Sequence, residues 1–219
     1  MTTTLHTFPY NPGYLLHQCS ELELAPIQQE VQAIADSQGR DYRPAHYDLV
    51  GVIDREYHLR ECRDHVARLV LPLADRYIEH FHYEVKINRL GLEPRGLELG
   101  ALWVNFQQPG EYNPIHQHDG LFSFVLWLSI PYTLEQERAV GPGSRQDYKP
   151  NGDFHFHYTD SLGAVKTHVM QADQSRQGQL CLFPAELHHV VYPYYSSRDL
   201  RISISGNLHL SWQSRQLEP

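Results

Sequence analysis

The clearest periodic pattern along the chain is helical and lies in its first half. From Arg63 to Tyr83, apolar residues recur at three- and four-residue intervals, which places them on one face of a helix. Pro72 is expected to kink this helix. A shorter helix is predicted from Ala25 to Ser37, with Pro26 at an N1-like position. Residues 1–25 carry no such pattern and are expected to be irregular.

After about residue 95 the pattern changes to that of strands. The apolar or alternating runs are ALWVNF (101–106), LFSFVLWLSI (121–130), FHFHY (154–158), AVKTHVM (164–170), QLCLF (179–183), VVYPYY (190–195) and LRISISGNLHL (200–210). Pro-Gly and Asn-Gly turn signals separate several of them. We therefore expect an α+β protein with an antiparallel barrel or sandwich as its core. A single domain is predicted over 1–219, with 1–95 as a helical support region and 96–212 as the core.

Composition narrows the class of protein. The chain has 219 residues, 41% of them hydrophobic, enough for one domain with a sizeable core. Its net charge of -8 gives no electrostatic reason to expect nucleic acid or a membrane surface as a partner. Three widely spaced cysteines indicate reduced thiols, and we see neither a signal peptide nor a membrane span. These features predict a soluble, cytoplasmic protein.

Histidine is unusually frequent, with 15 residues, and it is the commonest metal ligand in proteins. Four close pairs compete: His80/His82, His116/His118, His155/His157 and His188/His189. His80 and His82 lie in the helical region, where residues two apart do not face each other. His155 and His157 alternate with aromatic residues, which indicates the polar face of a half-buried strand or, alternatively, the lining of a substrate mouth.

The other two pairs are better placed to bind a metal ion. The segment NPIHQHDG leads from a turn-rich loop into a buried strand, and side chains two apart on a strand point to the same face. His116 and His118 can therefore reach one ion, although a bulge would bring Asp119 there instead. In LCLFPAELHHVVYP, either His188 or His189 offers a third ligand, and the other then points away.

An arginine follows twelve residues after His189. Arg201 opens the segment RISIS, in which Arg201, Ser203 and Ser205 share one strand face and the isoleucines share the other. An arginine there can bind a carboxylate through two hydrogen bonds, and a nearby hydroxyl can add a third. The alternative is a surface arginine on an edge strand. Taken in order, the histidines and Arg201 indicate a metal site followed by an anchor for an anionic co-ligand.

This order resembles the Fe(II)/2-oxoglutarate-dependent oxygenases, whose pattern is HxD/E…H…R on a double-stranded β-helix. The segments WVNFQQPGEYNPIHQHDG, LFSFVLWLSIP and LFPAELHHVVYPYYSSRDLRISISGN are similar to oxygenases of this superfamily from tailed phages of marine cyanobacteria and related bacteria. The resemblance covers residues 100–210 well and 49–59 more weakly. It implies a double-stranded β-helix (jelly-roll, cupin-like) core with the N-terminal helices packed on its outside.

The resemblance also implies a set of site residues. The metal ligands would be His116, His118 and His189, and the 2-oxoglutarate contacts would be Arg201, Ser203 and Asn105, with Gln107 as a further candidate. One departure stands out, because His118 occupies the position where the family has a carboxylate. A neutral imidazole there leaves the metal site one unit more positive than in the usual two-histidine, one-carboxylate arrangement.

The implied reaction uses Fe(II), 2-oxoglutarate and O2. It hydroxylates a C–H bond of a small-molecule or peptide substrate and releases succinate and CO2. One alternative is a cupin-like three-histidine metalloprotein that acts without 2-oxoglutarate, which would have no need of Arg201 and Ser203. A second is a non-catalytic binding domain that keeps only the fold. The oligomeric state and the substrate are not predicted.

Overall fold

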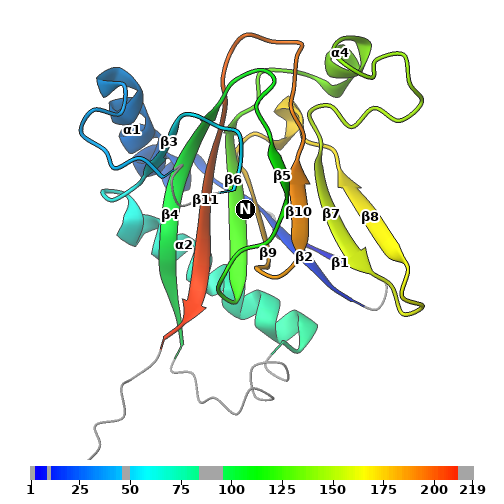
Figure 1. The fold of residues 1–219 in the computed structure, drawn as a ribbon. Coiled ribbons are helices and arrows are strands. Elements are labelled where there is room, and N and C mark those ends of the chain that lie inside the picture. The colour runs from blue at the N-terminus through cyan, green and yellow to red at the C-terminus, as the bar shows by residue number, and fades with distance from the viewer. Residues whose placement is uncertain (1–2, 9–10, 46–49, 84–95, 212–219) are drawn as a thin grey trace, which may run out of the picture.

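Two antiparallel sheets form the core of the protein, and two helices cover the outer face of the larger sheet (Figure 1). A computed structural model describes residues 3–8, 11–45, 50–83 and 96–211. The larger sheet has the strand order β1-β2-β9-β6-β11-β4-β3, and the smaller has the order β5-β10-β7-β8. This arrangement is the double-stranded β-helix, so the predicted α+β class, jelly-roll core and outer helices are confirmed.

The strands and helices are bounded as follows. The larger sheet contains β1 (Thr3–Phe8), β2 (Asn11–Gln18), β3 (Glu56–His58), β4 (Leu97–Gln107), β6 (Phe122–Ser129), β9 (Gln179–Pro184) and β11 (Arg201–Leu210). The smaller contains β5 (Asn113–His116), β7 (Phe154–Thr159), β8 (Val165–Met170) and β10 (His188–Val191). The helices are α1 (Glu21–Ser37), α2 (Arg63–Phe81), α4 (Leu134–Ala139) and a 3-10 turn at Gln174–Arg176. None of the helices in the described ranges has the length and apolar character needed to cross a bilayer.

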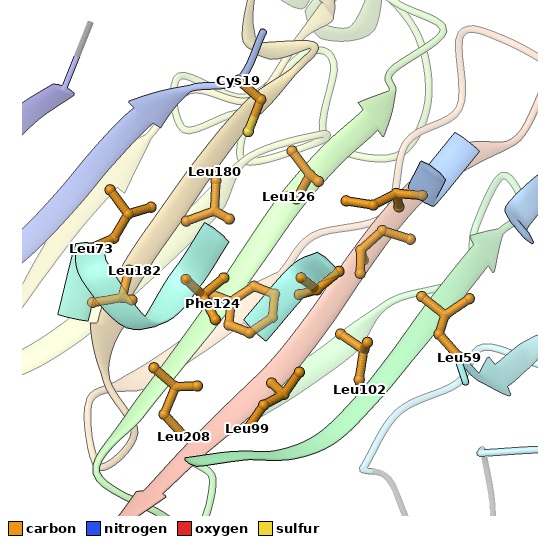
Figure 2. Close-up of a cluster of buried hydrophobic side chains, with 14 of the residues drawn as sticks. Cys19, Leu59, Leu73, Leu99, Leu102, Phe124, Leu126, Leu180, Leu182 and Leu208 are labelled. Carbon is orange, nitrogen blue, oxygen red and sulfur yellow. The ribbon is translucent and has the colours of Figure 1, made fainter. Parts of the chain in front are cut away.

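Strand alternation divides the larger sheet into two faces. On β6, Phe124 and Leu126 belong to the core beneath the helices, whereas Val125 and Trp127 belong to the core between the sheets. Figure 2 shows the helix-side core, which includes Leu73 of α2. The alternation therefore gives the chain two separate apolar layers, one under α1 and α2 and one between the sheets.

The inner face of the larger sheet is apolar on one half and polar on the other. The apolar half lies on β2, β9 and β6, whereas β3, β4 and β11 present polar side chains. Glu56, Asn105 and Ser203 form one row across these last three strands, because Asn105 pairs with Glu56 on one side and with Ser203 on the other. This polar half forms one wall of the cavity described below.

The N-terminal part of the chain is more regular than predicted. The expectation that residues 1–25 are irregular is wrong, because β1 and β2 pair with each other and β2 pairs with β9. Tyr14, Leu15 and Leu16 are buried in succession, with Leu15 in one core and its neighbours in the other. A strand covered on both faces shows no alternation of polar and apolar residues, so the pattern gave no strand signal there.

Helix α1 begins four residues earlier than predicted. Ser20 caps it by accepting a hydrogen bond from the backbone N–H of Glu23, while the Glu23 side chain accepts from the backbone N–H of Ser20. This is a capping box, whose S-x-x-E signal is present in the sequence. Pro26 therefore lies inside the helix and not at its N1 position.

A buried carboxylate joins the two helices. Glu30 of α1 accepts hydrogen bonds from the backbone N–H groups of Arg60 at 2.8 Å, Glu61 at 3.1 Å and Cys62 at 2.8 Å, just before α2 begins. Burial by itself raises the pKa of Glu30, but the three N–H donors outweigh it and the pKa is lowered. The ionised carboxylate thus satisfies the N–H groups of the segment that leads into α2, including that of the N-cap residue Cys62.

Glu30→Gln is expected to lower the free energy of unfolding by about 2 kcal/mol at neutral pH, because an amide NH2 replaces one of the charged acceptors. The difference in free energy of unfolding between the two proteins should shrink as the pH falls. A lowered pKa means that the ionised carboxylate stabilises the folded protein, and protonation removes that stabilisation. Urea denaturation at pH 7 and pH 4 measures both effects. Gln29→Ala, at an exposed position of the same helix, is the control, and an equal loss in both variants would contradict the prediction.

Candidate metal and cosubstrate site

Three histidines meet at the junction of β5 and β10. His116 ends β5, His118 follows two residues later, and His189 on β10 pairs directly with His116. Their ligand atoms all lie within 4.8 Å of one another. Asp119 is exposed and lies outside this group, and the neighbouring His188 is exposed. The structure therefore brings together the three predicted histidines and leaves out the two alternatives.

Hydrogen bonds fix the orientation of two of the three rings. Nδ1 of His116 lies 2.7 Å from the carbonyl oxygen of Pro114, and Nδ1 of His189 lies 2.9 Å from that of Leu187. A carbonyl oxygen only accepts, so each Nδ1 carries the proton and donates it. The Nε2 lone pair of each ring is then available to a metal ion, which is the usual arrangement in histidine metal sites.

The three imidazoles are neutral at physiological pH. Burial lowers the pKa of His118 to about 4, and the adjacent His116 adds to the shift. Burial likewise lowers the pKa of His116, and it holds that of the fully enclosed His189 well below its usual value. Metal ligation requires unprotonated imidazole. Three neutral nitrogen donors that converge at one point fit a divalent transition-metal ion.

The histidines line one cavity, and Arg201 lies in the same lining. Arg201 is buried, and its guanidinium donates to Gln107 Oε1 at 2.8 Å, Tyr132 Oη at 2.5 Å, Gly152 O at 3.1 Å and Tyr192 O at 2.9 Å. All four acceptors are neutral, and no ion pair among the described residues includes Arg201. Since a guanidinium has five N–H groups, one remains for an anion.

Asn105 organises the polar wall beside Arg201. Its side-chain oxygen accepts a hydrogen bond from Trp103 Nε1 at 3.0 Å, and its NH2 group donates to Ser203 Oγ at 3.1 Å and Ser205 Oγ at 3.3 Å. Because both serine oxygens act as acceptors here, both hydroxyl protons are free to donate elsewhere. The Trp103 ring also lies 5.8 Å from the ring of His118, so this network reaches the histidine cluster.

One functional candidate was missed from the sequence. Glu56 on β3 is only 2% exposed, yet it lines the same cavity. Burial raises the pKa of Glu56 to about 7, and the Glu111 carboxylate adds to the shift. The segment DREYHL carries no motif that marks it, and only the pairing of β3 with β4 brings Glu56 beside Asn105.

The remaining histidine pairs lie elsewhere. His155 is fully buried, with Nδ1 3.3 Å from Tyr148 Oη and Nε2 3.5 Å from Asp153. The prediction of a half-buried polar face is therefore wrong for His155, because β7 is covered on both sides there, and neither His155 nor His157 lies in the lining of the cavity. His80 and His82 are exposed at the end of α2.

Fold and site together define a double-stranded β-helix with a histidine cluster and a buried arginine in one cavity. The family model described as "Putative 2OG-Fe(II) oxygenase" matches residues 101–207, just under half of the chain. A prolyl-4-hydroxylase from Pseudomonas putida superposes with a TM-score of 0.52 at 14% identity, covering 93% of this chain and 95% of that chain. AviO1 from Streptomyces viridochromogenes gives 0.50 at 11% identity, covering 95% and 92%. At these identities the two structures show the fold alone. No curated protein matches the chain in sequence.

The matched residues 101–207 include the strands that carry the predicted ligands and cosubstrate contacts. The match is to a family of iron- and 2-oxoglutarate-dependent oxygenases, and the histidine cluster of this chain lies within the matched residues. This family match disfavours the alternatives of a cupin-like protein that acts without 2-oxoglutarate and of a non-catalytic domain.

Proposed function

We propose that His116, His118 and His189 bind the iron and that Arg201 binds the distal carboxylate of 2-oxoglutarate, so that the protein hydroxylates a C–H bond of its substrate. The observation that carries the proposal is the convergence of three neutral imidazoles in one cavity with a buried arginine that has no anionic partner among the described residues. The iron would supply the point at which 2-oxoglutarate and O2 react to give succinate, CO2 and the hydroxylated product.

The protein's own residues would hold the ligands in place. The carbonyl oxygens of Pro114 and Leu187 keep the imidazoles of His116 and His189 in the tautomer that presents Nε2. The buried setting keeps the three rings unprotonated, as the lowered pKa values indicate. Both effects favour metal binding before any cosubstrate arrives.

Arg201 suits a carboxylate for electrostatic reasons. Its positive charge is removed from water but compensated only by neutral acceptors, so an incoming anion gains a strong, poorly screened interaction. The four existing hydrogen bonds hold the guanidinium rigidly, which reduces the entropy lost on binding. Ser203 would add a hydroxyl donor, and Asn105 would act as a positioning residue that orients this hydroxyl.

The first experiment is anaerobic addition of Fe(II) and then 2-oxoglutarate to the purified protein, followed by visible absorption. We expect a charge-transfer band of the iron–2-oxoglutarate chelate in the wild type and succinate formation once O2 is admitted. Iron binding without such a band would contradict the assignment of Arg201 and Ser203. Absence of iron binding would contradict the ligand assignment.

Arg201→Lys is expected to weaken the apparent affinity for 2-oxoglutarate by about one to two orders of magnitude, because lysine keeps the charge but loses the planar fork that Gln107, Tyr132 and Tyr192 orient. Iron affinity should stay unchanged. Titrating the charge-transfer band with 2-oxoglutarate at saturating iron measures the effect. Arg198→Lys, three residues earlier and in the loop before β11, is the control. Equal 2-oxoglutarate affinities in wild type and Arg201→Lys would refute this role.

A second pair of variants tests the unusual ligand. His118→Ala should lower iron affinity strongly, whereas Asp119→Ala should leave it within about twofold, because Asp119 is exposed and outside the cluster. Calorimetric titration with Fe(II) under anaerobic conditions measures both. The reverse ranking would assign the second ligand to Asp119.

The substrate is proposed to be a small molecule or a peptide, with no nucleic-acid or membrane partner. A cytoplasmic location is supported by the three free and buried cysteines, Cys19, Cys62 and Cys181. Thiol titration of the denatured, non-reduced protein should find three free thiols, and fewer would argue against a reducing compartment.

A further inference from the structure

Two hydrogen-bond acceptors in the cavity wall have no donor among the described residues. The Glu56 carboxyl group is 2% exposed, and no hydrogen bond or ion pair within the described ranges includes it. The side-chain oxygen of Asn113 is buried and has no hydrogen-bond partner there. Both residues line the cavity. Buried polar groups in native proteins are nearly always satisfied, so two such acceptors in one cavity point to a ligand that donates.

The two acceptors come from chain segments that lie side by side. Glu56 begins the edge strand β3, Asn113 begins β5, and the segment before β3 is bonded to the segment before β5 through the backbone N–H of Val52 and the carbonyl of Tyr112 at 2.8 Å. A Cβ atom at Gly51 would lie 2.1 Å from the Asn113 side-chain oxygen. Only glycine therefore allows the Asn113 amide to occupy its position in the wall.

The cavity wall also holds two opposite charges that do not form an ion pair with each other. Apart from the neutral histidines, Arg201 and Glu56 are the two ionisable side chains in the lining that the structure describes. Arg201 is suited to the carboxylate of 2-oxoglutarate, and no ion pair among the described residues joins it to Glu56. A second anion would be repelled by Glu56, whereas a cation that carries N–H groups would satisfy both its charge and the orphan oxygen of Asn113.

We propose that this oxygenase acts on an amine, and that the substrate's ammonium group donates hydrogen bonds to the Glu56 carboxylate and the Asn113 side-chain oxygen. The inference rests on the proposed function, because it takes Arg201 as the cosubstrate's anchor. The apolar part of the amine would lie along Val50 and Ile53, which line the cavity beside Glu56. A protonated primary amine has three N–H donors, enough for both acceptors and one more partner.

The test compares n-butylamine with n-butanol, which has a similar shape but no charge. Trp103 and Trp127 line the cavity, so their fluorescence reports binding without iron or turnover. In the wild type we expect the ammonium to bind at least about tenfold more tightly than the alcohol, a preference that a charged hydrogen bond of the usual strength would give. Glu56→Gln should abolish the preference and Asn113→Ala should reduce it. Glu98→Gln, at an exposed position, should retain it.

Each outcome decides one question. Equal binding of amine and alcohol in the wild type, or an unchanged preference in Glu56→Gln, would overturn the proposal. If Glu56→Gln lost both the amine preference and the 2-oxoglutarate charge-transfer band, the proposal would also be overturned, because Glu56 would then serve the cosubstrate. An amine preference in a wild-type protein that shows no charge-transfer band would support amine binding while contradicting the 2-oxoglutarate assignment, so the two failures are distinguishable.

Discussion

His189→Gln is expected to weaken Fe(II) binding by more than about a hundredfold, whereas His188→Gln leaves it unchanged. Loss of a residue that merely orients a ligand already costs about 10- to 100-fold, so loss of the ligand itself should exceed that range. His189 is 3% exposed and presents its Nε2 to His116 and His118, while His188 is exposed at the next position of the same strand. Both substitutions replace a histidine by glutamine on the same strand. They differ only in the face of the strand on which the side chain lies.

Glutamine is chosen because it keeps much of the volume that His189 fills. The His189 ring stacks on Phe154 at 5.4 Å and contacts Phe183 at 5.0 Å, so alanine would add a packing loss to the loss of the ligand. Anaerobic calorimetry with Fe(II) gives the affinity, and thermal unfolding of both apo variants confirms that they fold. If His189→Gln bound iron as the wild type does, the assignment of the third ligand would be wrong.

The second large effect concerns stability and pH. Glu56→Gln is expected to raise the free energy of unfolding of the ligand-free protein by about 3 kcal/mol more at pH 8 than at pH 4. The folded-state pKa is about 7 against an ordinary value of 4.5, and each unit is worth about 1.36 kcal/mol. A raised carboxyl pKa means that folding disfavours the ionised form. The cost is absent below pH 4.5, grows between 4.5 and 7, and is complete above 7. Glutamine is never ionised and removes that cost.

Urea denaturation of wild type and Glu56→Gln at several pH values between 4 and 8 measures this difference. Glu98→Gln, exposed on β4, should show no comparable dependence on pH. A constant difference between wild type and Glu56→Gln across the range would mean that the carboxylate of Glu56 is compensated in the folded protein. A cationic substrate would then be disfavoured, because its binding to Glu56 requires a carboxylate with no charged partner in the protein.

The histidine in place of a carboxylate gives the proposed metal site a distinct charge. Three neutral imidazoles leave a bound divalent ion with its full charge, one unit more than the usual two-histidine, one-carboxylate set. A dianionic cosubstrate would be attracted more strongly by such a site.

Several features of the site could be predicted from local sequence alone, because strand geometry fixes which side chains share a face. The alternation in RISIS puts Arg201 and Ser203 on one side, and Ile204 does lie in the opposite core. The spacing of His116 and His118 likewise allowed them to converge. The capping box at Ser20 was equally readable, so the late start predicted for α1 was an error of interpretation and not a lack of information.

Other features depend on contacts between distant segments. About seventy residues separate His118 from His189, and the pairing of β5 with β10 closes that distance and selects His189 over His188. The pairing of β3 with β4 brings Glu56 into the cavity, and β2 was missed because both of its faces are covered. Local patterns report the periodicity of one segment and the side on which its residues lie. Which segments meet, and therefore which side chains lose water and shift their pKa values, is decided only by the tertiary structure, because burial and pairing are properties of two segments together.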